Sequence, residues 1–341
     1  MMQSTFPRSR INPLPQQSGA ALLAVYLIVF LAATISVSMV TQHTYDIRRA
    51  DYNKNFGQSY QLGLGVELWA LGQLHRDIVD DKKDARIDSL DESWTDKLIL
   101  RNINNIANVN GRISDSQARF NVNNLRYEKN KTADAKDAKA TARAHYLFLR
   151  RLLKTQEINP DLANAILDWV DKDSDASFPL GAEDPSYLDK NIPYRTAGRA
   201  ITHISELRLI KGITDKVFNK LKPLITALPA LTLININTAS KKVLLALSPD
   251  MTDSMADTII QQRITSPFKT PQEFIAFLKK ENAKITANSK QIAVLISTFS
   301  DFYVAHAEVS LNRSKLHLSS MIWRDQNKRT IKVYQRTRRK Q

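Results

Sequence analysis

The sequence predicts an α+β fold with a long N-terminal helix, an antiparallel sheet and a large inserted all-α domain. Three observations predict it. An uncharged apolar run near the N-terminus is continued by apolar residues at helical spacing. Helix-type patterns then dominate for about 150 residues. Near the C-terminus, apolar and polar residues alternate as they do in half-buried strands.

The composition is that of a folded, basic chain. Its 341 residues are 43% hydrophobic, which suffices for a packed core. Lys and Arg total 49 against 34 Asp and Glu, and the net charge of +15 favours nucleic acid, anionic lipid or an acidic protein as a partner. The sequence has no cysteine, which excludes disulfides, thiolate zinc sites and cysteine nucleophiles.

The apolar run extends from Ala20 to Val40, and its clearly polar members are Thr34, Ser36 and Ser38. At 1.5 Å per residue it is about 30 Å long, which matches the hydrocarbon thickness of a bilayer. Secretory h-regions are shorter, about 7 to 15 residues, so the run predicts a lasting membrane anchor. A removed signal peptide is the alternative, because small residues inside the run could form a cleavage site. Basic residues flank the run on both sides and leave its orientation open.

Apolar residues at steps of three or four follow the anchor and predict that the helix continues to about Val79. This stripe consists of Phe56, Tyr60, Leu64, Leu68, Leu71, Leu74 and Ile78. Glycines at 57, 63, 65 and 72 each weaken a helix by up to about 1 kcal/mol relative to Ala. A bend or break is therefore expected in this region.

Residues 108–125 predict a small hairpin with Asn110 and Gly111 at its turn. The charged, Ala-rich stretch 128–144 predicts an exposed linker or helix.

Two of the helices that follow have clear start signals. One begins at Asn159 and Pro160, and the other has a capping box from Thr270 to Glu273. Three antiparallel strands are predicted at the end of the chain, from alternation over 303–311 and 316–322 and a turn at 325–328 before 330–334.

An acidic cluster stands out in this basic chain. It contains Asp168, Asp171, Asp173, Asp175, Glu183 and Asp184 within 17 residues. Alternate Asp residues in a loop can turn their oxygens inward, which suits a hard cation that takes six to eight oxygen ligands. The stretch is not an EF-hand, because Ala176 stands where that loop needs Gly and Ala182 where it needs Glu. A solvated acidic loop is the alternative interpretation.

Residues 233–274 resemble the helix-hairpin-helix repeat of membrane-anchored competence DNA receptors. Such repeats need a Gly-rich hairpin, so that backbone N–H groups and a helix N-terminus can approach a phosphate. Here the hairpin at 248–253 has no Gly, one Pro and two carboxylates, and a second candidate at 209–214 has only Gly212. A membrane-anchored DNA receptor is therefore the alternative function, and no nucleic acid partner is expected.

Signals for catalysis are weaker still. The six histidines lie far apart in sequence, and HExxH, GxSxG and phosphate-binding Gly loops are absent. We therefore predict no catalytic or cofactor-binding residues and no enzymatic activity.

The junction of Ser18, Gly19 and Ala20 joins a polar leader with basic residues to the apolar run. It resembles a type IV prepilin leader, which a prepilin peptidase cuts after Gly19 to leave Ala20 as the mature N-terminus. Most pilin-like subunits carry Glu at the fifth mature position, where Ala24 stands here. A carboxylate in hydrocarbon is costly unless it is paired. The absence of this Glu is characteristic of the K-type minor pseudopilins of type II secretion.

The acidic segment "DWVDKDSDASFPLGAEDPSY" (168–187) also resembles the K-type pseudopilin family. The stretches "ARFNVNNL", "PYRTAGRAITHISELRLIKGIT" and "ININTA" resemble the same family in the same order. The resemblance covers nearly the whole chain. It implies calcium as a cofactor of the inserted domain, with Asp171, Asp173, Asp175, Glu183 and Asp184 as the ligand candidates.

The resemblance further implies a structural tip subunit that initiates or caps a pseudopilus for protein export across the outer membrane. Its expected partners are the I-type and J-type minor pseudopilins, the major pseudopilin and the prepilin peptidase. The protein would cross the inner membrane once and place its C-terminal domain in the periplasm. The implied domains are a leader (1–19), a transmembrane helix (20–45), the first part of a pilin-like domain (46–125), an inserted α-helical domain with helix-hairpin-helix or SAM-like units (126–296) and the C-terminal strands of the pilin-like domain (297–341).

Overall fold

The computed structural model describes residues 18–80, 86–103, 106–126, 135–312, 314–325 and 328–340. Almost all of the expected leader, and part of the charged stretch 128–144, lie outside the described residues. The chain forms two compact units, one that ends at Gly57 and one that begins at Gln58.

Helix α1 (Ser18–Asp80) contains the predicted apolar run and has 63 residues. The glycines do not interrupt it, so the expected break does not occur. Within the described residues, α1 is the helix that is long and apolar enough to cross a membrane by length and composition. Its most apolar window has a mean hydropathy of 2.5, and no part of that window is buried inside the protein.

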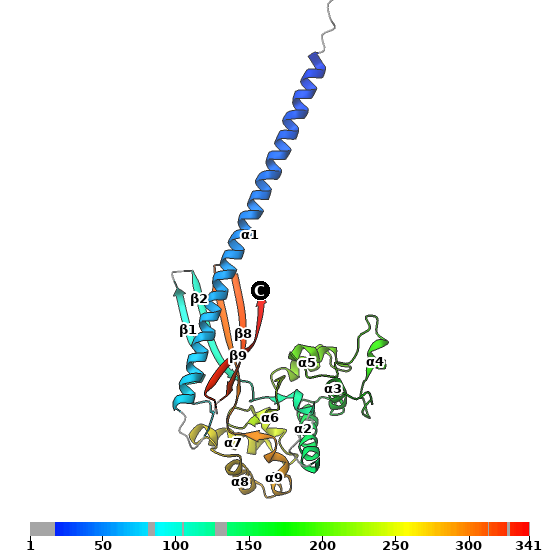
Figure 1. The fold of residues 1–341 in the computed structure, drawn as a ribbon, viewed down its shortest axis with the longest axis vertical. Coiled ribbons are helices and arrows are strands. Elements are labelled where there is room, and N and C mark those ends of the chain that lie inside the picture. Colours follow the sequence, from blue (N-terminus) through cyan, green and yellow to red (C-terminus); the bar gives the residue numbers. More distant parts are fainter. Residues whose placement is uncertain are drawn as a thin grey trace, which may run out of the picture. The chain divides into compact units, whose positions relative to one another are not determined.

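A five-stranded sheet of order β1-β2-β7-β8-β9 lies beside α1 in the second unit, and all its neighbouring strands are antiparallel (Figure 1). The strands are β1 (Leu98–Ile103), β2 (Ala107–Asp115), β7 (Phe302–Leu311), β8 (Ser314–Asp325) and β9 (Thr330–Lys340). The last three confirm the predicted C-terminal strands. β2 and β7 are far apart in sequence, yet they pair from Ala107 opposite Leu311 to Asp115 opposite Tyr303.

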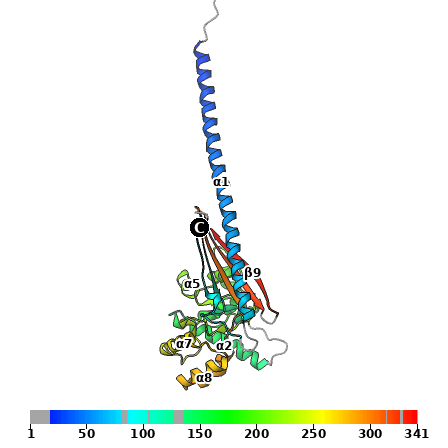
Figure 2. The same cartoon turned by 90° about the vertical axis from the view of Figure 1, so that its left-hand side faces the viewer.

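The part of α1 in the second unit packs along one face of this sheet (Figure 2). Its buried residues are Ser59, Gly63, Val66, Glu67, Ala70, Leu74, Asp77 and Ile78. The helix continues as the predicted stripe indicated, to Asp80. Within the stripe Leu74 and Ile78 are buried, Phe56, Tyr60, Leu64 and Leu71 are half-buried and Leu68 is 67% exposed, whereas the other buried residues of α1 lie outside it. The pattern misled because small residues and two paired carboxylates form much of the buried face, and neither registers as apolar periodicity.

The predicted hairpin turn at Asn110 and Gly111 is also wrong, because both residues lie inside β2. The β1–β2 connection lies instead between Ile103 and Ala107. Gly111 is needed where α1 approaches the strand. A Cβ built on it would lie 2.7 Å from Val66 Cγ1. The glycine marks a close approach of two elements and not a turn.

A mainly helical insert connects β2 to β7 (Figure 1). Its α-helices are α2 (Ala135–Thr155), α3 (Leu162–Val170), α4 (Asp184–Leu188), α5 (Asp215–Leu221), α6 (Lys241–Leu245), α7 (Asp253–Thr265), α8 (Pro271–Glu281) and α9 (Ile285–Ala293). It also contains two parallel strand pairs, β3 (Phe120–Asn121) with β4 (Ile225–Thr226) and β5 (Ile234–Asn235) with β6 (Ile296–Ser297). Short 3-10 helices lie in the insert at Val122–Arg126 and Ile204–Leu209, and another lies before β1 at Ser93–Thr95.

The insert has one continuous hydrophobic core that includes Phe148, Trp169, Leu244 and Phe274. Phe120 belongs to this core as well, upstream of the predicted domain start at 126. The capping prediction for α8 is confirmed, because the Thr270 side chain accepts a hydrogen bond from the Glu273 backbone N–H. A separate, smaller core lies between α1 and the sheet and includes Leu74, Trp94 and Tyr303.

Candidate functional sites

The acidic loop between α3 and α4 folds around one buried carboxylate. Asp168 is fully buried in the last turns of α3, and its Oδ2 accepts hydrogen bonds from the backbone N–H groups of Ser177 (3.0 Å) and Ala182 (2.8 Å). Gly181 is required here, because a Cβ would lie 2.1 Å from the Ser177 carbonyl oxygen and 2.4 Å from Asp168 Oδ2. The loop is thus held in shape from inside by Asp168.

Three of the predicted ligand residues meet in this loop. Asp171, Asp173 and Glu183 each offer a carboxylate oxygen, and these oxygens lie within 4.8 Å of one another. Burial, followed by the charges of Asp173, Asp168 and Glu183, raises the pKa of Asp171 to about 7. Burial and the charge of Asp168 also raise the pKa of Glu183. The four carboxylates therefore repel one another, and a cation between them would relieve that repulsion.

Buried carboxylate oxygens that accept no hydrogen bond also indicate a cation site. Among the described residues, Asp168 Oδ1, Asp171 Oδ1 and Glu183 Oε1 are buried and accept no hydrogen bond. Buried carboxylate oxygens are costly unless they are paired, hydrogen-bonded or bound to a metal. The donor set is all oxygen, which hard cations such as Ca²⁺ prefer. The residues present therefore fit a calcium ion.

The other two predicted ligands lie outside this group. Asp175 is exposed, and its backbone N–H donates to Asp173 Oδ1 over 3.1 Å. Asp184 accepts hydrogen bonds from the backbone N–H and hydroxyl of Thr196, each at 2.9 Å, and pairs with Arg195. These hydrogen bonds, first that of the Thr196 backbone, lower the pKa of Asp184. Asp168 was part of the acidic cluster in the sequence, but nothing in its spacing indicated its central position.

The predicted processing residues lie at the start of α1. The helix begins at Ser18, so both Gly19 and Ala20 are helical, and the side chain of Ala20 is exposed.

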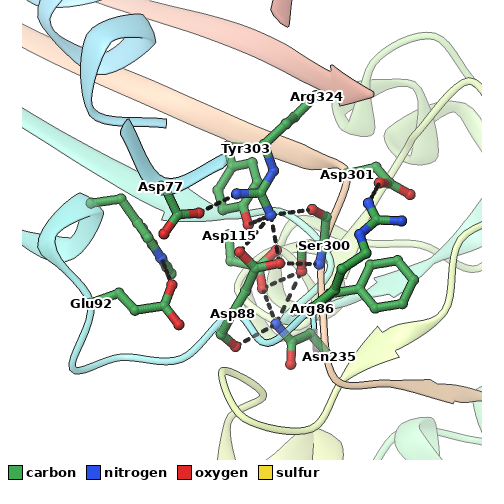
Figure 3. A network of polar contacts seen from close by, with 12 residues as sticks. Asp77, Arg86, Asp88, Glu92, Asp115, Asn235, Ser300, Asp301, Tyr303 and Arg324 are labelled. Atoms are coloured by element: carbon green, nitrogen blue, oxygen red, sulfur yellow. Dashed lines mark hydrogen bonds and ion pairs between the residues drawn. The ribbon is translucent and has the colours of Figure 1, made fainter. Parts of the chain in front are cut away.

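A second group of charges lies where α1 ends beside the sheet (Figure 3). The guanidinium of Arg324 on β8 is completely buried. It donates to Asp77 at the end of α1, to Asp88 in the following segment and to the hydroxyl of Tyr303 on β7. It also donates to the Ser300 carbonyl over 2.9 Å. One arginine thus joins four separate segments of the chain.

The same network reaches the insert. Asp115 at the end of β2 is buried, and its Oδ2 accepts hydrogen bonds from Thr238, Ser300 and Asn235. Asn235 also donates to the Asp88 carbonyl over 3.0 Å. Burial raises the pKa of Asp115 to about 6. Sheet, helix and insert are therefore joined by one set of polar contacts.

Carboxylates outnumber the cation at this junction. One oxygen each from Asp77, Asp88 and Glu92 lie within 4.8 Å of one another, and Arg324 pairs with Asp77 and Asp88. Burial, followed by the charges of Asp77 and Asp88, raises the pKa of Glu92 to about 8. At neutral pH Glu92 is therefore mainly protonated, and this proton removes one of the three negative charges. Sequence reasoning missed this group because its members are separated by up to 247 residues.

In the helix-hairpin-helix region, side chains of the chain itself lie where a DNA-binding repeat would bind a phosphate. Helix α7 follows the hairpin, and its N-cap Thr252 accepts from the backbone N–H of Met255. Asp253 and Asp257 lie in the first turns, where they bind Lys241 at 3.2 and 2.8 Å. This helix N-terminus thus faces carboxylates of its own chain, which oppose a phosphate.

Comparisons with known proteins give a consistent result. Two family models described as type II secretion system protein K match residues 118–230 and 234–294, which together are just over half of the chain. A type II secretion system protein K of Pseudomonas aeruginosa is 29% identical over 315 residues, covering 90% of this chain and 89% of its own. A protein of the same description from Pectobacterium carotovorum is 28% identical and covers 90% of this chain and 92% of its own.

The fold has a counterpart among solved structures. A chain in the crystal structure of the GspK-GspI-GspJ complex from the enterotoxigenic Escherichia coli type 2 secretion system matches with a TM-score of 0.67 and 20% sequence identity. The match covers 85% of this chain and 99% of that one.

Proposed function

This chain belongs to the protein K family of the type II secretion system, the K-type minor pseudopilins, and we propose that it forms the tip of a secretion pseudopilus. The observation that carries the proposal is the extent of the likeness, which covers nine-tenths of the chain in the relative from Pseudomonas aeruginosa. In this role the subunit would initiate or cap assembly. The insert between β2 and β7 would lie at the end of the filament and hinder further addition there.

The partners in this proposal are the I-type and J-type minor pseudopilins, with the major pseudopilin below them. The solved neighbour comes from a complex of GspK with GspI and GspJ, which supports the first two. The major pseudopilin follows from the filament role.

The prepilin peptidase would remove the leader after Gly19 and leave Ala20 as the mature N-terminus. The apolar part of α1 would then hold the subunit in the inner membrane, with the second unit in the periplasm. The mean hydropathy of 2.5 supports a membrane anchor. Ala24 replaces the carboxylate that most pilin-like subunits carry, and a subunit at the end of the filament has no need for that pairing group.

Calcium is part of the proposal because the acidic loop fits it. Asp171, Asp173 and Glu183 would hold the ion, and Asp168 would support them from below. Bound calcium would neutralise the mutual repulsion of these carboxylates and stabilise the loop. The proposal gives the ion a structural role and includes no catalytic residue.

The decisive experiment is complementation of a strain that lacks its own protein K. The full chain should restore export of the secreted protein and copurify with the I-type and J-type subunits. Mass spectrometry of the membrane-extracted chain should show a start at Ala20, and a Gly19→Val variant should keep the leader. A mature start between Ala33 and Thr41 would instead indicate a secretory signal. Tight duplex DNA binding with a steep salt dependence would support the DNA receptor.

A further inference from the structure

One end of the sheet is rich in cations. It is the end where the β1–β2 and β7–β8 connections lie and where β9 finishes. The described residues of the stretches that form it, 98–112, 306–318 and 336–340, include seven Lys and Arg residues and one acidic residue, Glu308. Here we call this end the basic sheet end, with exposed Arg101 on β1, Lys315 on β8, and Arg336 and Arg338 on β9.

The described acidic residues near the basic sheet end are few, and one of them, Glu67, is paired. Glu67 on α1 is buried and accepts two hydrogen bonds from Arg336, at 2.7 and 2.8 Å. Glu308 on β7 faces His317 over 3.9 Å. The pairing with Glu67 fixes Arg336 in place and leaves 46% of its side chain exposed. The positive charge at this end is thus held on a rigid strand and remains accessible.

Arg336 and Arg338 line a shallow hollow together with Tyr60 on α1 and Leu318 on β8. Its volume is about 160 Å³, and it is open to solvent. A phosphate group is small enough to enter it, and planar guanidinium groups bind phosphate oxygens well. The hollow is therefore suited to one phosphate in contact with two arginines.

Apolar side chains are exposed at the same end. Ile106 in the β1–β2 connection is 47% exposed, and Ile99 and Leu100 on β1 are 52% and 44% exposed. Exposed apolar residues among cations are typical of proteins that lie in the headgroup region of a bilayer. A purely acidic protein surface would match the charges and leave these apolar side chains unused.

The position of the basic sheet end in the chain points the same way. Helix α1 enters the second unit beside it, since Gly63 contacts Leu316 and Leu318 and Tyr60 borders the hollow. Val40, the last residue of the apolar run, lies only 20 residues before Tyr60. In an anchored chain, about 30 Å of helix therefore tethers this surface to the apolar run, which raises its local concentration near lipid.

We propose that the basic sheet end docks on anionic phospholipid headgroups, with a lipid phosphate between Arg336 and Arg338. This inference rests on the membrane anchorage proposed above. Docking would hold the second unit at the membrane surface before the subunit joins a filament, and leaving the membrane would free it. Each cation near an anionic surface contributes a factor of roughly five in affinity, and salt weakens the contribution.

The test uses the full chain reconstituted into vesicles of phosphatidylcholine, with or without phosphatidylglycerol. Hydrogen exchange of residues 98–108 and 314–340 is then compared. With phosphatidylglycerol we expect amide exchange there to be slower by about threefold or more, and the protection to vanish at 0.5 M salt. A Lys315→Gln and Arg338→Gln double variant should lose the protection. The matched control, Lys279→Gln with Lys280→Gln on exposed positions of α8, should keep it.

Two results would overturn the docking proposal. One is equal exchange in both kinds of vesicle. The other is protection that needs added I-type and J-type subunits and is independent of lipid charge, which would make this surface a protein interface. Flotation with the vesicles tests the anchor separately. A chain that floats with both vesicles but shows equal exchange disproves docking alone, and a chain that floats with neither disproves the anchorage.

Discussion

Arg324 and Asp88 are both fully buried, and Arg324 Nη2 lies 2.6 Å from Asp88 Oδ2. The two residues are 236 positions apart and belong to β8 and to the segment after α1. Burial lowers the pKa of Arg324, but the nearby Tyr303, Asp88 and Asp77 outweigh this effect and raise it. The arginine is therefore charged at any pH the protein meets. Asp77 and Asp88 are buried beside it and need this charge as their counter-ion.

Replacing Arg324 by Met should strongly destabilise the second unit. The change leaves Asp77 and Asp88 buried without their counter-ion, which costs about 3 to 5 kcal/mol of unfolding free energy. Denaturant unfolding of the full chain measures it. Arg208→Met is the matched control, because Arg208 pairs with Asp215 on the surface and its loss costs at most about 1 kcal/mol. Similar losses in both variants would contradict the role of the buried network.

Glu92 should make the stability depend on pH. Its pKa is raised from 4.5 to about 8 in the folded protein, so the folded state binds more protons than the unfolded state between these values. The unfolding free energy should therefore fall as pH rises from about 5 to about 8. A Glu92→Gln variant mimics the protonated side chain and should show a flatter pH profile. Parallel profiles for the two proteins would show that Glu92 does not titrate in this range.

Gly111→Ala should lower stability through a clash with α1. The new methyl group would lie 2.7 Å from Val66 Cγ1 and force the helix and strand apart, at about 1 to 3 kcal/mol. Val66→Ala should relieve this clash, so the double variant should lose less than the sum of the two single variants. Thermal unfolding of all four proteins gives the comparison. Additive losses would mean that the two residues do not interact.

Calcium binding should distinguish two aspartates of the acidic loop. Asp173→Ala removes one oxygen from the group with Asp171 and Glu183 and should weaken binding by roughly tenfold or more. Asp175→Ala changes an exposed side chain outside that group and should leave the affinity within about twofold. Calorimetric titration of the full chain in detergent measures both. Equal losses would place both residues among the ligands, and no heat with the unmodified chain would end the calcium proposal.

The sequence revealed much of the fold because its strongest patterns are local. The apolar run, the alternation after Tyr303 and the capping box at Thr270 each depend on residues close in sequence, and all agree with the structure. The buried face of α1 escaped prediction because Glu67 and Asp77 read as polar surface positions. Both are buried only because arginines more than 240 residues away reach them.

Gly111 shows a second limit of local reasoning. Asn-Gly is a strong turn signal, and only the approach of Val66 from α1 explains why it lies inside a strand. The acidic loop was predictable only in part. Its composition indicated a cation, but which oxygens converge depends on the loop path around Asp168, and no spacing rule describes that path.

The pairing of Asp115 with Tyr303 has a practical consequence. The insert leaves and re-enters the sheet at two directly opposed positions, so topologically it is a single very long hairpin loop. Evolution could enlarge, trim or replace such a loop without changing the order of the strands. A designer could do the same, provided that a substitute is found for the contacts of Asp115 with Asn235 and Thr238.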